Sequence, residues 1–388
     1  MTQSILSAIF KVSFFLLFIG GGFLAFVGVP FRPFFVVFLL IFALPLLPNK
    51  NIPISFYVFA SIILISGYLN GSSSKEVLYF IRFFITPSLV LIFLRTVVGQ
   101  FNLTRIFRLF LFIGIIQLPV IIFQKLFYDE LIVYSAVMID ITDFDFGSFY
   151  IANDPATTFY LLCLIVILLF NSKSHQYITL PYFWVGYFAF TILITNARMA
   201  HILLALVLLA FFLMKMSLKN ILSGAVLLVF IVISLYFSGF LDQLLENFQD
   251  LVWRITFDVD EYSSYENFAA GRYSREAAVL YYLNEPLKFF GDGPSKYYDP
   301  VTQEYLVGNN GLIFTFYSEI GLLGLGAGYM VIYSIAREFS DKRVAFIPIL
   351  FSFCMIGLTI TTNVLSDMSI IFSFVLFLSI NKKILYEN

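Results

Sequence analysis

The chain has 388 residues, of which 60% are hydrophobic, 19% aromatic and only 12% charged, and its formal net charge is −1. An ordinary soluble domain carries about twice this charged fraction, so the composition excludes a water-soluble core and predicts a membrane protein. Its two cysteines, Cys163 and Cys354, lie within apolar runs, which excludes a disulfide framework. The near-zero net charge gives no reason to expect a nucleic-acid partner, and we expect none.

Apolar runs recur along the whole chain and predict an all-α, polytopic membrane protein with about 12 transmembrane helices. We expect residues 1–388 to form a single transmembrane domain. The first run follows one lysine and has no small-residue cleavage site after it, so we expect a retained helix and not a signal peptide. The predicted spans lie near residues 12–29, 34–48, 52–69, 79–94, 106–124, 155–170, 179–195, 200–214, 220–238, 311–336, 344–362 and 368–381.

The distribution of lysine and arginine between alternate loops predicts the orientation. With both termini in the cytoplasm, 13 of the 23 cations face inward, and five of the other ten lie in one long loop that the positive-inside rule does not count. The ratio in the short loops is therefore 13 to 5. We expect both termini to be cytoplasmic, in a multi-pass protein of the bacterial inner membrane.

Two predicted outer segments are longer than a turn. Residues 125–154 hold six acids, and residues 239–310 form a long periplasmic loop between the ninth and tenth spans. In this loop, apolar residues from Leu241 to Ile255 fall on one helical stripe. A second short helix is predicted from about Tyr273 to Leu283, ended by "NEP", and "GDGP" predicts a tight turn after it.

Arg198 and His201 stand three residues apart where a predicted span begins, so they share a helix face that meets the outer water. A guanidinium stays charged and binds phosphate through two parallel hydrogen bonds, which favours an anion site. An arginine here also serves as an anchor that reaches from a helix end to the headgroups. Both interpretations stay open.

Arg272 and Arg275 begin the predicted loop helix after "AAG". Cations at a helix N-terminus oppose the helix dipole unless an anion lies beside them, which favours an anion site. The alternative is a solvated helix start with a local salt bridge to Glu276. Three further cations of the loop are interpreted as structural: Arg254, Lys288 and Lys296.

Glu319 lies about two turns inside the tenth span. A buried acid is protonated, paired with a cation or in contact with a wet cavity, and each case directs it toward the bundle interior. The "DFD" of Asp143 to Asp145 is the only match to an acidic metal motif, and it falls on the outer side, away from cytoplasmic nucleotide sugars. With no phosphate-binding glycine loop and no zinc-type spacing, we expect no metal and no cofactor.

Three segments, in this order, resemble the O-antigen polymerase and O-antigen ligase family of Wzy-like membrane glycosyltransferases. The first, "TNARMAHILLALVLLAFFL", is similar to the family's short arginine motif at a span entrance. The second, "GRYSREAAVLYYLNEPLKFFGDGP", resembles its arginine, helix and P-L-x-x-x-G-x-G-P pattern, and the third, "GNNGLIFTFYSEIGLLGLG", its H-N-x-x-L and E-x-G-x-x-G-L segment. The resemblance covers roughly residues 190–335.

The resemblance implies that undecaprenyl-diphosphate-linked oligosaccharide repeat units, held in membrane lipid, are donor and acceptor, with the lipid diphosphate as leaving group. It also implies a partner that governs chain length. The implied catalytic residues are Arg198, Arg272 and Glu319, and the implied substrate-binding residues are Arg275, His201, Asn309 and Asn310. The arginines would stabilise the departing diphosphate without a metal. Glu319 is the candidate base ahead of His201, and the asparagines would orient a sugar hydroxyl.

One position departs from the family pattern. The family's histidine falls on Asn309 or Asn310, depending on the alignment, so no histidine is present there. This favours the polymerase branch, or a different base. The ligase branch, which transfers glycan to lipid A core, stays an alternative. So does a lipid-linked oligosaccharide flippase or another 12-span transporter, although the loop after the sixth span is short (171–178), whereas transporters of the major facilitator type have a long one there.

Overall fold

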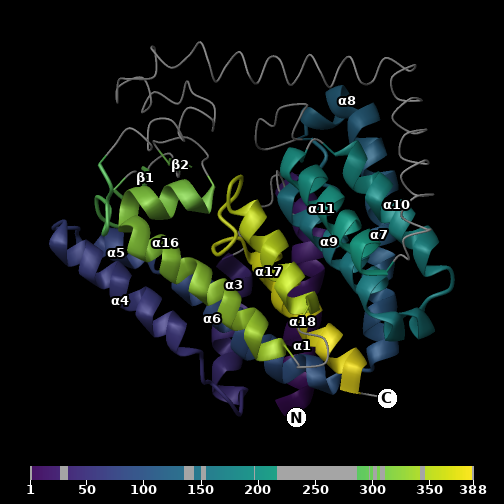
Figure 1. Cartoon of the computed structure of the whole chain (residues 1–388), viewed down its shortest axis with the longest axis horizontal. Helices are drawn as coiled ribbons and strands as arrows, with labels where there is room; N and C mark the ends of the chain where they lie inside the picture. The colour runs from purple at the N-terminus through teal and green to yellow at the C-terminus, as the bar shows by residue number, and fades with distance from the viewer. Residues whose placement is uncertain are drawn as a thin grey trace.

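The computed structural model describes residues 2–26, 34–134, 144–149, 154–195, 197–215, 286–296, 298–299, 304–305, 311–340 and 346–386. Within these ranges the regular structure is helical, apart from one two-residue strand pair (Figure 1). The all-helical prediction is therefore confirmed for the described part of the chain. The ninth predicted span, residues 220–238, lies outside the described residues.

The described elements of each type occur along the chain in the following order. The α-helices are α1 Thr2–Phe15, α2 Gly21–Phe26, α3 Phe34–Ala43, α4 Ile54–Leu69, α5 Ser74–Phe80, α6 Arg82–Val97, α7 Leu103–Leu126, α8 Tyr128–Ile132, α9 Asp154–Phe170, α10 Pro181–Ile194, α11 Arg198–Lys215, α16 Leu312–Phe339, α17 Phe346–Leu358 and α18 Met368–Tyr386. A π-helical turn, Leu16–Gly20, and 3₁₀ turns, Leu44–Leu46, Val98–Gln100 and Ser172–Tyr177, extend them. The strands are β1 Tyr298–Asp299 and β2 Glu304–Tyr305, paired antiparallel.

Five of the described helical segments are long and apolar enough to cross a membrane, by length and composition: Thr2–Gly20, Ser74–Gln100, Leu103–Leu126, Leu312–Phe339 and Met368–Tyr386. Six shorter apolar helices of 10–17 residues accompany them, and they coincide with predicted spans. The first helix begins at Thr2, ten residues before the predicted start. It extends so far because Leu6, Phe10 and Phe14, each one turn apart, are all buried.

Two helices form the centre of the bundle. Every residue of α18 from Met368 to Asn381 is buried, and the described side chains of α9 are buried from Ala156 to Leu169. Aromatic side chains dominate the contacts around them; Tyr160 of α9, for example, lies 4.9 Å from Phe377 of α18, ring centre to ring centre. A helix that is apolar on all sides is expected in such a central position, since it has no face suited to water.

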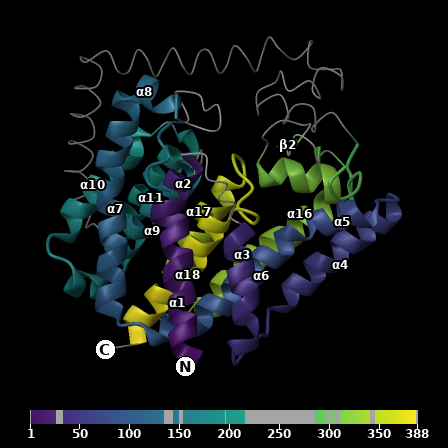
Figure 2. The ribbon, with the colours of Figure 1, turned by 180° about the vertical axis from the view of Figure 1, so that it is seen from behind.

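Both ends of the chain lie at the same end of the bundle (Figures 1 and 2). Cations that the sequence assigns to the cytoplasmic side gather there on helix-terminal carbonyls. Lys173 donates to the carbonyl of Leu385 (3.0 Å), Lys382 to that of Glu338 (3.1 Å), and Arg95 forms an ion pair with Glu338. The two lysines satisfy carbonyls that the helix ends leave unpaired.

Candidate functional site

Helix α16 is broken at Gly321, whose backbone has φ 71° and ψ −171°. Only glycine adopts this combination without strain. The break interrupts the regular hydrogen bonding, so the last carbonyls of the first half and the first N–H groups of the second half need partners from elsewhere. The sequence predicts one span near residues 311–336, and the break within it was not predicted.

The segment 286–296, which contains the "GDGP" turn, supplies the missing partners on both sides of the break. Asp292 N–H donates to the carbonyl of Ser318 (2.8 Å), and Gly293 N–H donates to that of Glu319 (2.9 Å). In the other direction, Leu322 N–H donates to the backbone carbonyl of Lys288 (2.9 Å), and Leu323 N–H donates to that of Phe289 (3.2 Å). Four backbone hydrogen bonds therefore join the two halves of α16 through a segment outside the helix.

Glycine allows this contact because the two backbones touch directly. A Cβ at Gly321 would lie 2.3 Å from the carbonyl carbon and oxygen of Phe289, and a Cβ at Gly291 would lie 2.4 Å from the carbonyl carbon of Glu319. Both distances are far below van der Waals contact, and backbone atoms cannot move aside as a side-chain end can. Gly291 also has φ 68°, in the left-handed region. The chain turns here, with Lys296 N–H donating to the carbonyl of Gly293 (3.3 Å), and the contact with α16 explains the glycine at position 291.

Glu319 is fully buried at the end of the first half of α16. Its Oε2 accepts a hydrogen bond from the backbone N–H of Ser295 (2.9 Å). Ser295 has φ 55°, a left-handed conformation that costs energy for a residue with a side chain. A carboxylate that accepts a backbone N–H makes a strong bond, so Glu319 helps to hold this turn in its conformation. This geometry favours a positioning role for Glu319; its assignment as a base stays a prediction.

An ion pair closes the same segment. Lys288 Nζ lies 2.8 Å from Asp292 Oδ2, and both side chains are partly exposed. The structural interpretation of Lys288 fits this contact. Exposed pairs of this kind contribute little to stability, on the order of 0–1 kcal/mol. The segment is therefore held mainly by the backbone hydrogen bonds, which the close approach at the glycines permits.

The other predicted site residues are described in part. Arg198 is the first residue of α11, but only its backbone is described. His201 lies in the first turn of α11, as predicted, and its Nε2 lies 3.0 Å from the carbonyl of Ile192 near the end of α10. The remaining four lie outside the described residues: Arg272, Arg275, Asn309 and Asn310.

A second polar cluster lies where α7 and α10 end and residues 144–149 pack against the bundle. Lys125 lies 3.3 Å from Asp145, which is fully buried, and it donates to the carbonyl of Ile194 (2.6 Å). Gln124 bonds both the N–H (2.9 Å) and the carbonyl (2.8 Å) of Gly147. The second acid of "DFD" is thus paired with a lysine. Among the described residues, no group of three histidines, cysteines or acids could hold a metal ion.

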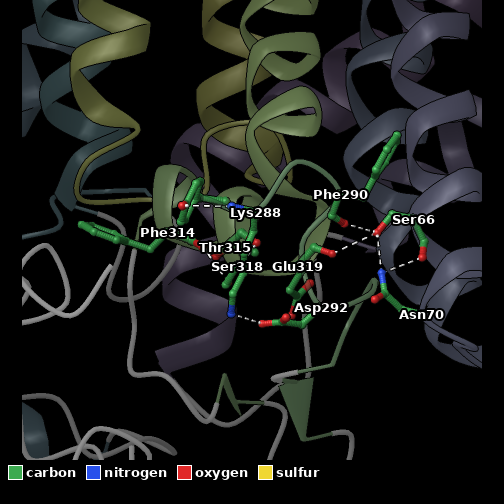
Figure 3. A network of polar contacts seen from close by, with 10 residues as sticks. Ser66, Asn70, Lys288, Phe290, Asp292, Phe314, Thr315, Ser318 and Glu319 are labelled. Atoms are coloured by element: carbon green, nitrogen blue, oxygen red, sulfur yellow. Dashed lines mark hydrogen bonds and ion pairs between the residues drawn. The ribbon is translucent and has the colours of Figure 1, made fainter. Parts of the chain in front are cut away.

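Sequence reasoning missed the contribution of α4. Ser66 near its C-terminal end bonds the carbonyls of Phe290 in the segment 286–296 and of Glu319 at the break in α16, and Asn70, which follows the helix, donates to the carbonyl of Ser66 (Figure 3). The only signal in the sequence is the change from apolar residues to the small and polar "SGYLNGSSS", which by itself predicts a helix end and a loop.

No protein-family model, curated protein or solved structure matches the chain. The site is therefore interpreted from its own geometry. That geometry joins two distant segments, "GDGP" and "SEIG", into one backbone unit at the break in α16. Such a unit can hold an adjoining loop in a fixed orientation.

Proposed function

We propose that this protein polymerises undecaprenyl-diphosphate-linked oligosaccharide repeat units into O-antigen or a related surface polysaccharide. The reaction would take place at the outer face of a bacterial inner membrane, in a protein of twelve spans with both termini in the cytoplasm. The donor is already activated and is delivered in the bilayer, so neither ATP nor a nucleotide sugar is needed at that face.

One observation carries the proposal. Two of the three segments that resemble the polymerase and ligase family lie against each other, and the residues common to the pattern make the contact. Gly291 and Gly293 meet the carbonyl side of Glu319, and Gly321 meets Phe289. A pattern of glycines and one acid that is spread along the chain thus has a single physical purpose, which a chance resemblance of separate segments does not predict.

The proposed reaction is a metal-independent glycosyl transfer. A hydroxyl on the sugar of one lipid-linked unit attacks the anomeric carbon of another, and the bond from that carbon to the phosphate oxygen breaks. Lipid diphosphate leaves with the bonding electrons, and the hydroxyl proton passes to a base or to water. Arg198 and Arg272, with Arg275 in support, stabilise the negative charge that develops on the diphosphate. A base would add about 10²- to 10⁴-fold, so the charge stabilisation is the larger requirement.

The test is to replace each arginine in a strain that lacks the native protein. Arg198→Ala and Arg272→Lys should insert at normal levels and leave single repeat units on the lipid carrier. The matched control is Arg105→Ala, because Arg105 is an exposed arginine in the first turn of α7, on the predicted cytoplasmic side. Full-length polymer from both variants would remove the arginine assignment but leave the activity itself standing.

The lipid-linked glycan profile of the deletion strain tests the activity. Loss of polymer, with single units accumulating on the outer face, supports polymerisation. Polymer that stays on the carrier and no longer reaches lipid A core would mean a ligase. Units trapped on the inner face would mean a flippase, and an unchanged profile would refute all three.

A further inference from the structure

We propose that the C-terminal end of α4 is the docking site for the "GDGP" segment, and that Ser66 is a positioning residue for the transfer reaction. This inference rests on the proposed function and extends it to a helix that lies outside the stretch of family resemblance. Ser66 is fully buried, and its Oγ lies 2.6 Å from the carbonyl oxygen of Phe290 and 3.1 Å from that of Glu319.

This hydroxyl contacts both the segment 286–296 and the first half of α16. A serine hydroxyl carries one proton, so it donates mainly to Phe290 and shares the bond with Glu319. Phe290 follows Lys288 and Phe289, whose carbonyls accept the first N–H groups of the second half of α16, and it precedes the "GDGP" turn. Glu319 ends the first half. The Ser66 hydroxyl therefore bonds both sides of the backbone junction (Figure 3).

The rest of the helix end is shaped for the same segment. A Cβ at Gly67 would lie 2.7 Å from Val77 Cγ2 and 3.6 Å from Pro294 Cγ, so this face of α4 lies close to the turn and has little room for a larger residue. A Cβ at Gly293 would lie 2.6 Å from Ser72 Oγ and 3.1 Å from Asn70 Cβ, closer than real Cβ contacts. Asn70 in turn donates to the carbonyl of Ser66 (2.9 Å), which fixes the last turn of α4.

These bonds would affect catalysis by fixing the position of the loop relative to α4 and α16. Glu319 accepts the N–H of Ser295 with its carboxylate and the hydroxyl proton of Ser66 with its backbone carbonyl, so α4, the loop and α16 hold one another. The segment belongs to the C-terminal part of the predicted outer loop, residues 239–310, which also carries Arg272 and Arg275. An error of about 1 Å in the placement of a reacting group lowers the rate by roughly 100-fold, so a fixed loop end matters even though Ser66 touches no substrate.

The experiment compares Ser66→Ala with Ser61→Ala in the full-length protein in nanodiscs. Ser61 lies on the exposed side of the same helix, and its hydroxyl bonds only its own helix, to the carbonyl of Tyr57 (2.8 Å). Hydrogen exchange of the backbone amides in 288–296 and at Leu322 and Leu323 should become roughly tenfold faster in Ser66→Ala and stay unchanged in Ser61→Ala.

The kinetic arm uses a purified lipid-linked repeat unit and measures the initial rate of dimer formation per mole of folded protein. Ser66→Ala should lower kcat roughly tenfold or more and change KM less than about threefold, because the loss affects alignment and not binding. Unchanged exchange would overturn the docking site, and faster exchange with an unchanged kcat would overturn the positioning role. A wild-type protein that forms no dimer would instead refute the proposed function, while the exchange result would still decide the docking.

Discussion

Replacing Gly321 by alanine should separate the "GDGP" segment from α16. The new Cβ would lie 2.3 Å from the carbonyl carbon and oxygen of Phe289 and 2.5 Å from the backbone nitrogen of Gly291, so the segment has to move away. Four backbone hydrogen bonds are then lost, at about 1 kcal/mol net each. If α16 keeps its break, an alanine at position 321 must adopt a backbone conformation suited only to glycine, which costs about 1–3 kcal/mol more of folding free energy.

The chain can avoid part of this cost by straightening α16, which relieves the strain and returns the first N–H groups of the second half to internal partners. We therefore expect Gly321→Ala to lower the free energy of unfolding by about 2–5 kcal/mol. The matched control is Gly326→Ala in the same helix, where nothing lies within 4 Å of the added Cβ. A helix-interior alanine at an open site should be neutral or stabilise by up to about 1 kcal/mol.

The assay is equilibrium unfolding of both variants in the same bicelles, followed by the fraction of folded protein as denaturant increases. A parallel exchange experiment reports whether the amides of Asp292 and Gly293 lose protection. Gly321→Ala would refute the reasoning if it unfolded at the same denaturant concentration as Gly326→Ala with those amides still protected. In that case the break would be incidental to the contact.

Three further predictions test other parts of the structure. Glu319→Gln keeps an oxygen that can accept the N–H of the turn, so it should be more stable than Glu319→Ala by about 1–3 kcal/mol in thermal unfolding, and equal stability would argue against the bond. Asn171 and Asn381 are buried and bond each other (2.8 Å), so each single change to leucine should cost about 1–3 kcal/mol and the double change clearly less than the sum. Tyr134→Cys should react with an impermeant maleimide added from the periplasm, and Lys50→Cys should react only after lysis. The two native cysteines are buried and should give little background labelling. The reverse pattern would invert the proposed orientation.

The helices could be predicted from the sequence because lipid requires each span to be apolar and to satisfy its own backbone. The start of α1 was placed ten residues too late, since its first turns mix polar residues with a buried stripe that only packing reveals. The break at Gly321 could not be predicted from "SEIGLLGLG" because glycine is equally common in unbroken, closely packed helices. The conformation of this residue depends on a partner segment that lies about thirty residues away in the chain.

The candidate site, like the fold, could be predicted from the sequence only in part. Glu319 was expected to point into the bundle, and it is buried, because a charge in lipid needs a partner. The partner itself, a backbone N–H of the "GDGP" turn, was not predictable, since a backbone donor leaves no trace in residue identity. Ser66 escaped notice for a similar reason. A serine in an apolar helix is usually satisfied by its own helix, as Ser61 is.

The contact between Ser66 and Phe290 joins residues 224 positions apart in the chain. During synthesis, α4 therefore enters the membrane long before its counterpart exists, and its small, polar end waits in water or against lipid headgroups. Assembly of this side of the bundle can finish only after residues 286–296 and α16 have been synthesised. A chain that stalls before residue 286 would leave the end of α4 without the carbonyl of Phe290, so completion of this side of the bundle depends on synthesis of the later segment.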